Sequence, residues 1–138
     1  SKKGVLRGLH YQLPPFSQTK LVQVLQGIVL DVVVDIRKGS PTFGHHFSCE
    51  LSAENQLQVF IPRGFAHGFI TLSETSVFMY RVDQYYNFAS EGSITPNDPV
   101  LGIDWQLPQS EWIQSHKDKK HPTLAEASLF DYNEKLYD

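Results

Sequence analysis

Two short stretches of this chain carry polar side chains where a strand built only for packing would have no use for them. The first, Val-Leu-Arg-Gly-Leu-His-Tyr-Gln at residues 5–12, places Arg7 and His10 among apolar residues. The second, Gly-Phe-Ala-His-Gly-Phe at residues 64–69, places His67 between two glycines. An imidazole titrates near pH 6.5, so it can accept and return protons at neutral pH. These residue types therefore suit general acid–base chemistry, although a single histidine is more often structural.

Side-chain alternation puts two more polar groups on apolar strand faces. Lys20 shares a face with Val22, and Tyr80 shares a face with Phe78. If those faces line the interior, a lysine and a tyrosine point into an apolar barrel, and a buried lysine is costly unless it is paired or used. Two alternatives stay open: Lys20 lies at a strand end and reaches solvent, and Tyr80 is an ordinary core residue.

The spacing of Arg7 and His10 raises a separate question, because residues three positions apart in a regular strand lie on opposite faces. Gly8 lies between them and could form a β-bulge that brings both side chains to one face. Without such a bulge, the arginine and the histidine serve different surfaces.

The six histidines do not suggest a metal site. His45 and His46 are adjacent, so on a strand they point in opposite directions, and the chain has no His-x-His pair. A barrel metal site usually combines two or three histidines with a carboxylate on converging strands. His10 and His67 could converge, but no third ligand is evident, so we predict no metal. The chain also has no phosphate-binding glycine loop and no Gly-x-Ser-x-Gly motif.

Short β-branched and aromatic runs separated by Gly, Pro and Asn or Asp predict an all-β fold in which the strands are antiparallel. The expected strands are residues 5–13, 20–25, 28–36, 45–51, 58–61, 66–72 and 77–85. Loops follow, with short helices expected over residues 110–117 and 124–133. With no repeat or linker, the simplest organisation is a single domain over residues 1–138.

Composition limits the partners of the chain. The net charge is −3 with neutral histidines, which does not favour a nucleic-acid partner. No apolar run reaches the ~18 residues of a membrane-spanning helix, so we predict no membrane association. Cys49 is the only cysteine, which agrees with a cytoplasmic location.

Six stretches in order along the chain carry a resemblance to a known family. They are KGVLRGLHYQ (3–12), KLVQVLQG (20–27), VVVDIRKGSPTFG (32–44), LSAENQLQVFIPRGFAHGF (51–69), YRVDQYY (80–86) and EGSITPNDPVLGIDW (91–105). The chain resembles the dTDP-4-dehydrorhamnose 3,5-epimerase family. The resemblance implies a cupin-like jelly-roll barrel, a homodimer, a site inside the barrel, no metal and no cofactor. It also implies a further N-terminal segment before residue 3.

The resemblance assigns roles to individual residues. His10 corresponds to the general base, Tyr80 to the general acid, Lys20 to a lysine beside the sugar, and Asp118 to the carboxylate that pairs with the catalytic histidine. Substrate contacts correspond to Arg7, His67, Tyr86, Glu91 and Lys117.

The implied activity is inversion of C3 and C5 of dTDP-4-keto-6-deoxy-D-glucose, a nucleotide-sugar substrate, in dTDP-L-rhamnose biosynthesis. Two alternatives remain open. One is epimerisation at C3 only or C5 only of a related nucleotide-linked 4-keto sugar. The other is a non-catalytic module that binds sugar nucleotides.

Overall fold

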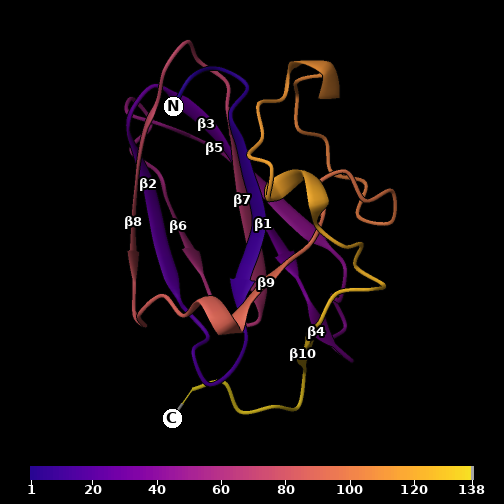
Figure 1. Ribbon diagram of the computed structural model, residues 1–138. Coiled ribbons are helices and arrows are strands. Elements are labelled where there is room, and N and C mark those ends of the chain that lie inside the picture. The colour runs from indigo at the N-terminus through magenta and orange to yellow at the C-terminus, as the bar shows by residue number, and fades with distance from the viewer. Residues whose placement is uncertain (138) are drawn as a thin grey trace.

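The computed structural model describes residues 1–137, and its strands form two antiparallel sheets that face each other (Figure 1). The larger sheet has the order β5-β3-β7-β1-β9 and the smaller has the order β6-β2-β8. Two short strands, β4 and β10, pair in parallel beside them. The bounds are β1 Leu6–Gln12, β2 Lys20–Gln26, β3 Ile28–Asp35, β4 Arg37–Lys38, β5 His46–Ser52, β6 Gln58–Ile61, β7 Phe65–Thr71, β8 Val77–Val82, β9 Glu91–Ser93 and β10 Phe130–Asp131.

All seven strands expected from the sequence are present, with bounds that differ by at most three residues. The all-β class and the cupin-like antiparallel jelly-roll architecture are thus confirmed. Three further strands, β4, β9 and β10, are only two or three residues long. Strands this short carry no alternation that a sequence could reveal, because they exist only through their pairing with neighbours.

The expectation of helices over residues 110–117 and 124–133 is wrong, because residues 1–137 contain no α-helix. Short 3₁₀ turns occur instead: η1 Phe88–Ser90, η2 Gln109–Glu111 and η3 Asp118–Lys120. Ile113 forms a parallel bridge with Val5, and β10 pairs with β4, so hydrogen bonding to neighbouring strands holds both segments extended. None of the helical turns in this part of the chain is long and apolar enough to cross a membrane.

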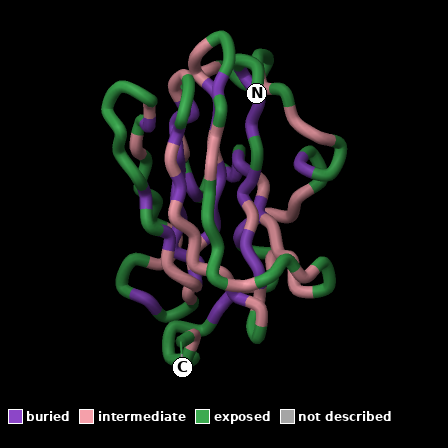
Figure 2. Tube along the Cα trace, turned by 90° about the vertical axis from the view of Figure 1, so that its left-hand side faces the viewer, coloured by how far each residue is buried: buried purple, intermediate pink, exposed green. Residues whose placement is uncertain are grey.

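Strand β3 is buried on both faces, and this explains its nearly continuous apolar sequence. Its inward residues Val29 and Val33 pack in a core between the two sheets. Its outward residues Leu30 and Val32 pack beneath the C-terminal segment, against residues such as Trp105. Figure 2 shows buried positions within the strands and many exposed positions in the connections. Strands β5 and β8 are mostly exposed or half-buried. Apolar side chains therefore line part of the space between the sheets. Charged groups that lie there need hydrogen-bonding or oppositely charged partners.

Strand β1 has the bulge that its sequence suggested. The register with β7 shifts between Arg7 and His10, so both side chains face the space between the sheets while Leu6 and Leu9 pack on the opposite face. Gly8 makes this possible with a φ of +122°. A Cβ there would lie 2.7 Å from the Cα of Gly68 and 2.8 Å from the carbonyl oxygen of His67.

The Gly8→Ala variant is expected to lose at least about 1–3 kcal/mol of unfolding free energy, because it combines an unfavourable φ with a backbone clash. Chemical denaturation measures the change. Gly102→Ala is the matched control, since Gly102 has a φ of +60° and nothing within 4 Å of the added Cβ. Equal losses in the two variants would contradict the role given to the bulge.

Candidate functional site

A cavity of about 680 Å³ opens between the two sheets. Its volume lies within the range of about 300–1,000 Å³ typical of small-molecule sites. Five residues predicted from the sequence line it: His10 on β1, Lys20 on β2, Tyr80 on β8, Tyr86 in the following loop, and Glu91 on β9. These elements are far apart in sequence, and the jelly roll brings them to one opening.

A smaller hollow of about 160 Å³ adjoins this cavity, since His10, Lys20 and Tyr80 line both. Arg7 and His67 line the smaller hollow. Seven of the nine predicted site residues thus surround one connected space. The other two, Lys117 and Asp118, lie at the turn η3 and contact residues of its wall.

Asp118 binds one ring nitrogen of His10, with 3.0 Å between Nε2 and Oδ1. The carboxylate is buried, whereas the imidazole is 27% exposed at the cavity. Among the residues that the structure describes, Nδ1 of His10 has no hydrogen-bond partner, and the nearest carboxylate oxygen is Glu91 Oε1 at 3.7 Å. A carboxylate on one ring nitrogen fixes the orientation of the imidazole, which is the arrangement typical of a histidine that acts as a general base.

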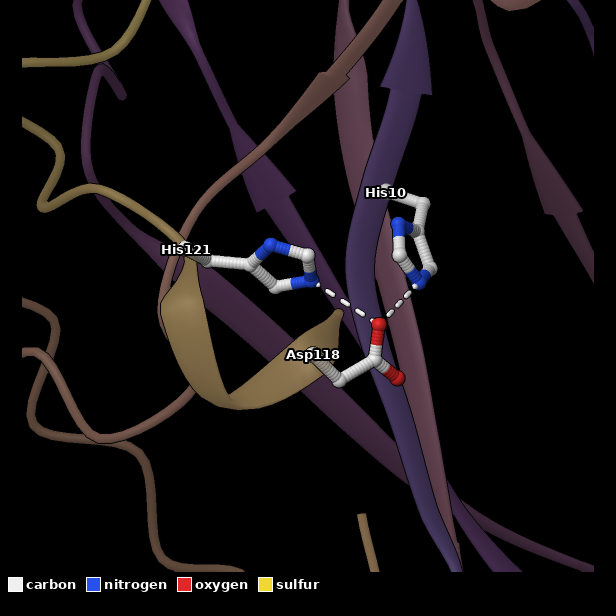
Figure 3. Close-up of side chains that lie close together, drawn as sticks. All are labelled: His10, Asp118 and His121. Atoms are coloured by element: carbon white, nitrogen blue, oxygen red, sulfur yellow. Dashed lines mark hydrogen bonds and ion pairs between the residues drawn. The ribbon is translucent and has the colours of Figure 1, made fainter. Parts of the chain in front are cut away.

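Asp118 is ionised in this arrangement. Burial by itself favours the neutral carboxyl group, but hydrogen bonds from His10, His121 and the Gly8 N–H outweigh it and lower the pKa of Asp118 to about 2. His121 was not among the residues predicted from the sequence. Its Nε2 lies 2.9 Å from the same oxygen that His10 contacts (Figure 3). Burial lowers the pKa of His121, and the hydrogen bond to Asp118 partly offsets this, so the ring is neutral near pH 7.

Glu91 joins three predicted residues into one cluster. The Lys117 Nζ donates to both of its oxygens, at 2.7 and 2.8 Å. The Tyr86 hydroxyl donates to Oε2 at 2.7 Å. Burial by itself raises the pKa of Glu91, but these hydrogen bonds and the Lys117 charge outweigh it and lower the pKa. Glu91 is therefore an anion that holds a lysine and an exposed tyrosine at the edge of the cavity.

Lys20 points into the cavity rather than out to solvent, so the alternative of a strand-end lysine that reaches water is wrong. Burial lowers the pKa of Lys20, and the nearby charges of Asp31 and Glu91 partly restore it. Tyr80 also differs from an ordinary core residue, because its side chain is 59% exposed while it lines both hollows. A cation and a phenol thus face the same space as His10.

His67 forms a buried pair with Asp31, at 2.7 Å between Nε2 and Oδ2. Asp31 is the second site residue that the sequence analysis missed. It interrupts the apolar run of β3 on the inward face, between Val29 and Val33, and a carboxylate at such a position is a signal of a buried pair. His121 gives no comparable signal, because it lies in a turn beyond the last long strand.

Comparisons with known proteins agree with this geometry. A sequence profile described as dTDP-4-dehydrorhamnose 3,5-epimerase matches residues 1–126. The dTDP-4-dehydrorhamnose 3,5-epimerase of Salmonella typhimurium is 53% identical over 129 residues, which are 94% of this chain and 70% of that protein.

Two solved structures are similar to this chain in both fold and sequence. The 3,5-epimerase of Legionella pneumophila, in complex with dTDP-4-keto-L-rhamnose, has a TM-score of 0.92 and 49% identity, and the match covers 97% of this chain and 72% of that one. A 3′-monoepimerase from Streptomyces bikiniensis, in complex with dTDP-quinovose, has a TM-score of 0.82 and 39% identity over 91% of this chain and 63% of that one.

Proposed function

Since the chain belongs to the dTDP-4-dehydrorhamnose 3,5-epimerase family, we propose that it is an isomerase that inverts C3 and C5 of dTDP-4-keto-6-deoxy-D-glucose. The product is dTDP-4-keto-L-rhamnose, in dTDP-L-rhamnose biosynthesis. One observation carries the proposal: an imidazole bound to a buried carboxylate shares a cavity with a lysine and a tyrosine. A module that only binds a sugar nucleotide would not need an imidazole paired with a buried carboxylate beside a lysine and a tyrosine.

The reaction needs a base, an acid and a group that stabilises negative charge. Hydrogens at C3 and C5 are acidic because each carbon is next to the C4 ketone. His10 removes one, and Asp118 stabilises the imidazolium that forms. The electron pair moves to O4, where the ammonium group of Lys20 stabilises the enolate. Tyr80 then donates a proton to the opposite face of the carbon, which inverts it while the enolate returns to the ketone. His10 releases to solvent the proton that it took, and the phenolate of Tyr80 takes one up.

The remaining predicted residues hold the nucleotide sugar. Arg7 offers a fork of donors that suits a phosphate or sugar oxygen. Tyr86 is exposed at the cavity, and its ring offers a flat face on which the thymine of the nucleotide can stack. His67 lines the smaller hollow, where it can contact the sugar, and the Glu91–Lys117 pair can contact the substrate at the edge of the cavity.

The product identifies the reaction. Incubation of the protein with dTDP-4-keto-6-deoxy-D-glucose, followed by proton NMR of the sugar ring, is expected to give the coupling pattern of the rhamno configuration. Recovery of unchanged substrate from a sample that binds it would indicate a sugar-nucleotide binding module and contradict the proposal.

A single-centre epimerase is the second candidate, favoured by the similarity to a 3′-monoepimerase.

The Tyr80→Phe variant tests whether Tyr80 is the general acid. Its expected result is that solvent deuterium still enters the substrate through His10, while inverted product forms about 10²–10⁴-fold more slowly. Proton NMR in D₂O measures both rates. Tyr85→Phe, which alters another exposed tyrosine of the same cavity, is the control. Full-rate inversion by Tyr80→Phe would contradict its role as the acid.

We further propose that the chain forms a homodimer, as the resemblance implies. An exposed apolar cluster supports this: Phe47, Leu57 and Phe60 are 60%, 49% and 63% exposed and line one hollow. A patch of this kind is typical of an interface. Sedimentation velocity is expected to show a dimer that Phe60→Asp converts to monomer, while Phe88→Asp, at another exposed phenylalanine, leaves it intact. A monomeric parent protein would contradict the proposal.

The cytoplasmic location of the protein stays a prediction.

A further inference from the structure

We propose that His10, Asp118 and His121 form a binding site for a divalent transition-metal ion such as Zn²⁺, and that an ion bound there stops His10 from acting as a base. The binding part stands on geometry alone. The inhibitory part rests on the proposed function. The sequence analysis predicted no metal because no third ligand was evident, and His121 supplies that ligand from the segment after the last long strand.

The donor atoms already converge. The Nε2 atoms of His10 and His121 lie 3.0 and 2.9 Å from the same carboxylate oxygen, and all three atoms lie within 4.8 Å of one another. Zn²⁺ binds nitrogen and oxygen at about 2.0–2.2 Å, which in a tetrahedral site places neighbouring ligand atoms about 3.3–3.6 Å apart. Both rings point toward Asp118 from different elements, β1 and the turn η3 (Figure 3). Small shifts would therefore place an ion among them.

The chemical set also fits. Two imidazoles and one carboxylate are ligands that Zn²⁺ and its neighbours in the first transition series accept. The side chains of Asp118 and His121 are each 3% exposed, so they are held in place by packing. His10 is 27% exposed at the cavity, so an ion can enter from that side and keep a position for water.

Groups behind the ligands complete the arrangement. Histidine ligands commonly donate their other N–H to a carboxylate. The Nδ1 atom of His10 is buried without a hydrogen-bond partner in the described part of the chain, and Glu91 Oε1 lies 3.7 Å away. When an ion binds Nε2, the ring proton moves to Nδ1, and this N–H can then donate a hydrogen bond to Glu91. The backbone N–H of Gly8 donates to Asp118 Oδ2 at 3.4 Å and helps hold the carboxylate.

Metal binding and base catalysis then exclude each other. A neutral imidazole has one lone pair and one N–H. If the ion takes the lone pair on Nε2, the proton on Nδ1 leaves no site that can accept hydrogen from C3 or C5. The bound ion does not fill the cavity, so inhibition is expected to lower kcat while KM changes little.

Cobalt absorption tests the site without any assay of activity. Titration of the protein with Co²⁺ is expected to give visible bands that saturate at one ion per chain and disappear when Zn²⁺ is added. His121→Ala is expected to weaken Co²⁺ binding at least tenfold, whereas His116→Ala, at an exposed histidine close by, leaves it unchanged. Absence of these bands in the parent protein, or equal binding by His121→Ala, would overturn the proposal.

Hydrogen exchange tests the consequence. Zn²⁺ is expected to suppress deuterium uptake at C3 and C5 in the parent protein, with recovery on addition of EDTA, and the residual exchange of His121→Ala should resist the same concentration. Equal sensitivity of the two proteins would overturn the inhibitory part. If the parent protein shows no exchange without metal, the proposed function fails, while the cobalt titration still decides the metal site.

Discussion

Replacing His10 with alanine is expected to slow deuterium uptake at C3 and C5 together by about 10²–10⁴-fold. One residue serves both centres because His10 is the imidazole that lines both hollows and is bound to the buried Asp118. Of the three described histidines that lie against a carboxylate, His10 has the most exposed side chain, at 27% against 8% for His67 and 3% for His121. Proton NMR of the substrate in D₂O gives the rate at each carbon.

The matched control is His45→Ala, which removes an exposed histidine just before β5. It is expected to keep the parent exchange rates. Thermal unfolding of both variants shows whether a lost rate reflects a lost fold. A folded His10→Ala protein that exchanges either hydrogen at the parent rate would mean that another base serves that carbon.

Replacing Lys20 with methionine is expected to lower kcat by about 10²–10³-fold, the loss found when one donor to a developing oxyanion is removed. Methionine keeps the length of the side chain and its apolar contacts while removing the charge. The reason for so large an effect is burial: Lys20 lies in the cavity near Asp31 and Glu91, where water screens its charge poorly. Steady-state kinetics separates kcat from KM.

The result for Lys20→Met distinguishes two roles. Stabilisation of the enolate acts only in the transition state, so kcat and kcat/KM should fall together. A raised KM with an unchanged kcat would instead make Lys20 a contact of the ground-state substrate and contradict the proposed mechanism. Lys38→Met, at an exposed lysine on β4, is the control and should change neither constant.

The strands could be predicted because each of the seven longer ones carries its own alternation or apolar run. The bulge in β1 followed from one glycine between two polar residues that a regular strand would separate. The C-terminal segment could not be predicted in this way. Its conformation depends on hydrogen bonds to distant partners, such as Ile113 with Val5, which local sequence does not encode.

The site residues on strands could likewise be predicted from the sequence, whereas those in the C-terminal turn could not. Residues on strands, such as Lys20 and Tyr80, could be placed by the faces that they share with apolar neighbours. Asp118 was assigned through the family resemblance, and His121 was missed, because both lie in a turn whose position is set by packing against β1. Asp31 was overlooked although its place on the inward face of β3 could have revealed it.

In the proposed mechanism, His10 removes hydrogen from both C3 and C5 within the cavity. The most direct test is to incubate the parent protein and the His10→Ala variant with dTDP-4-keto-6-deoxy-D-glucose in D₂O and follow both positions by proton NMR. Deuterium is expected at both carbons with the parent protein and at neither, on the same timescale, with the folded variant. Deuterium at either carbon with the folded variant, at the parent rate, would contradict the role of His10 as the base for both centres.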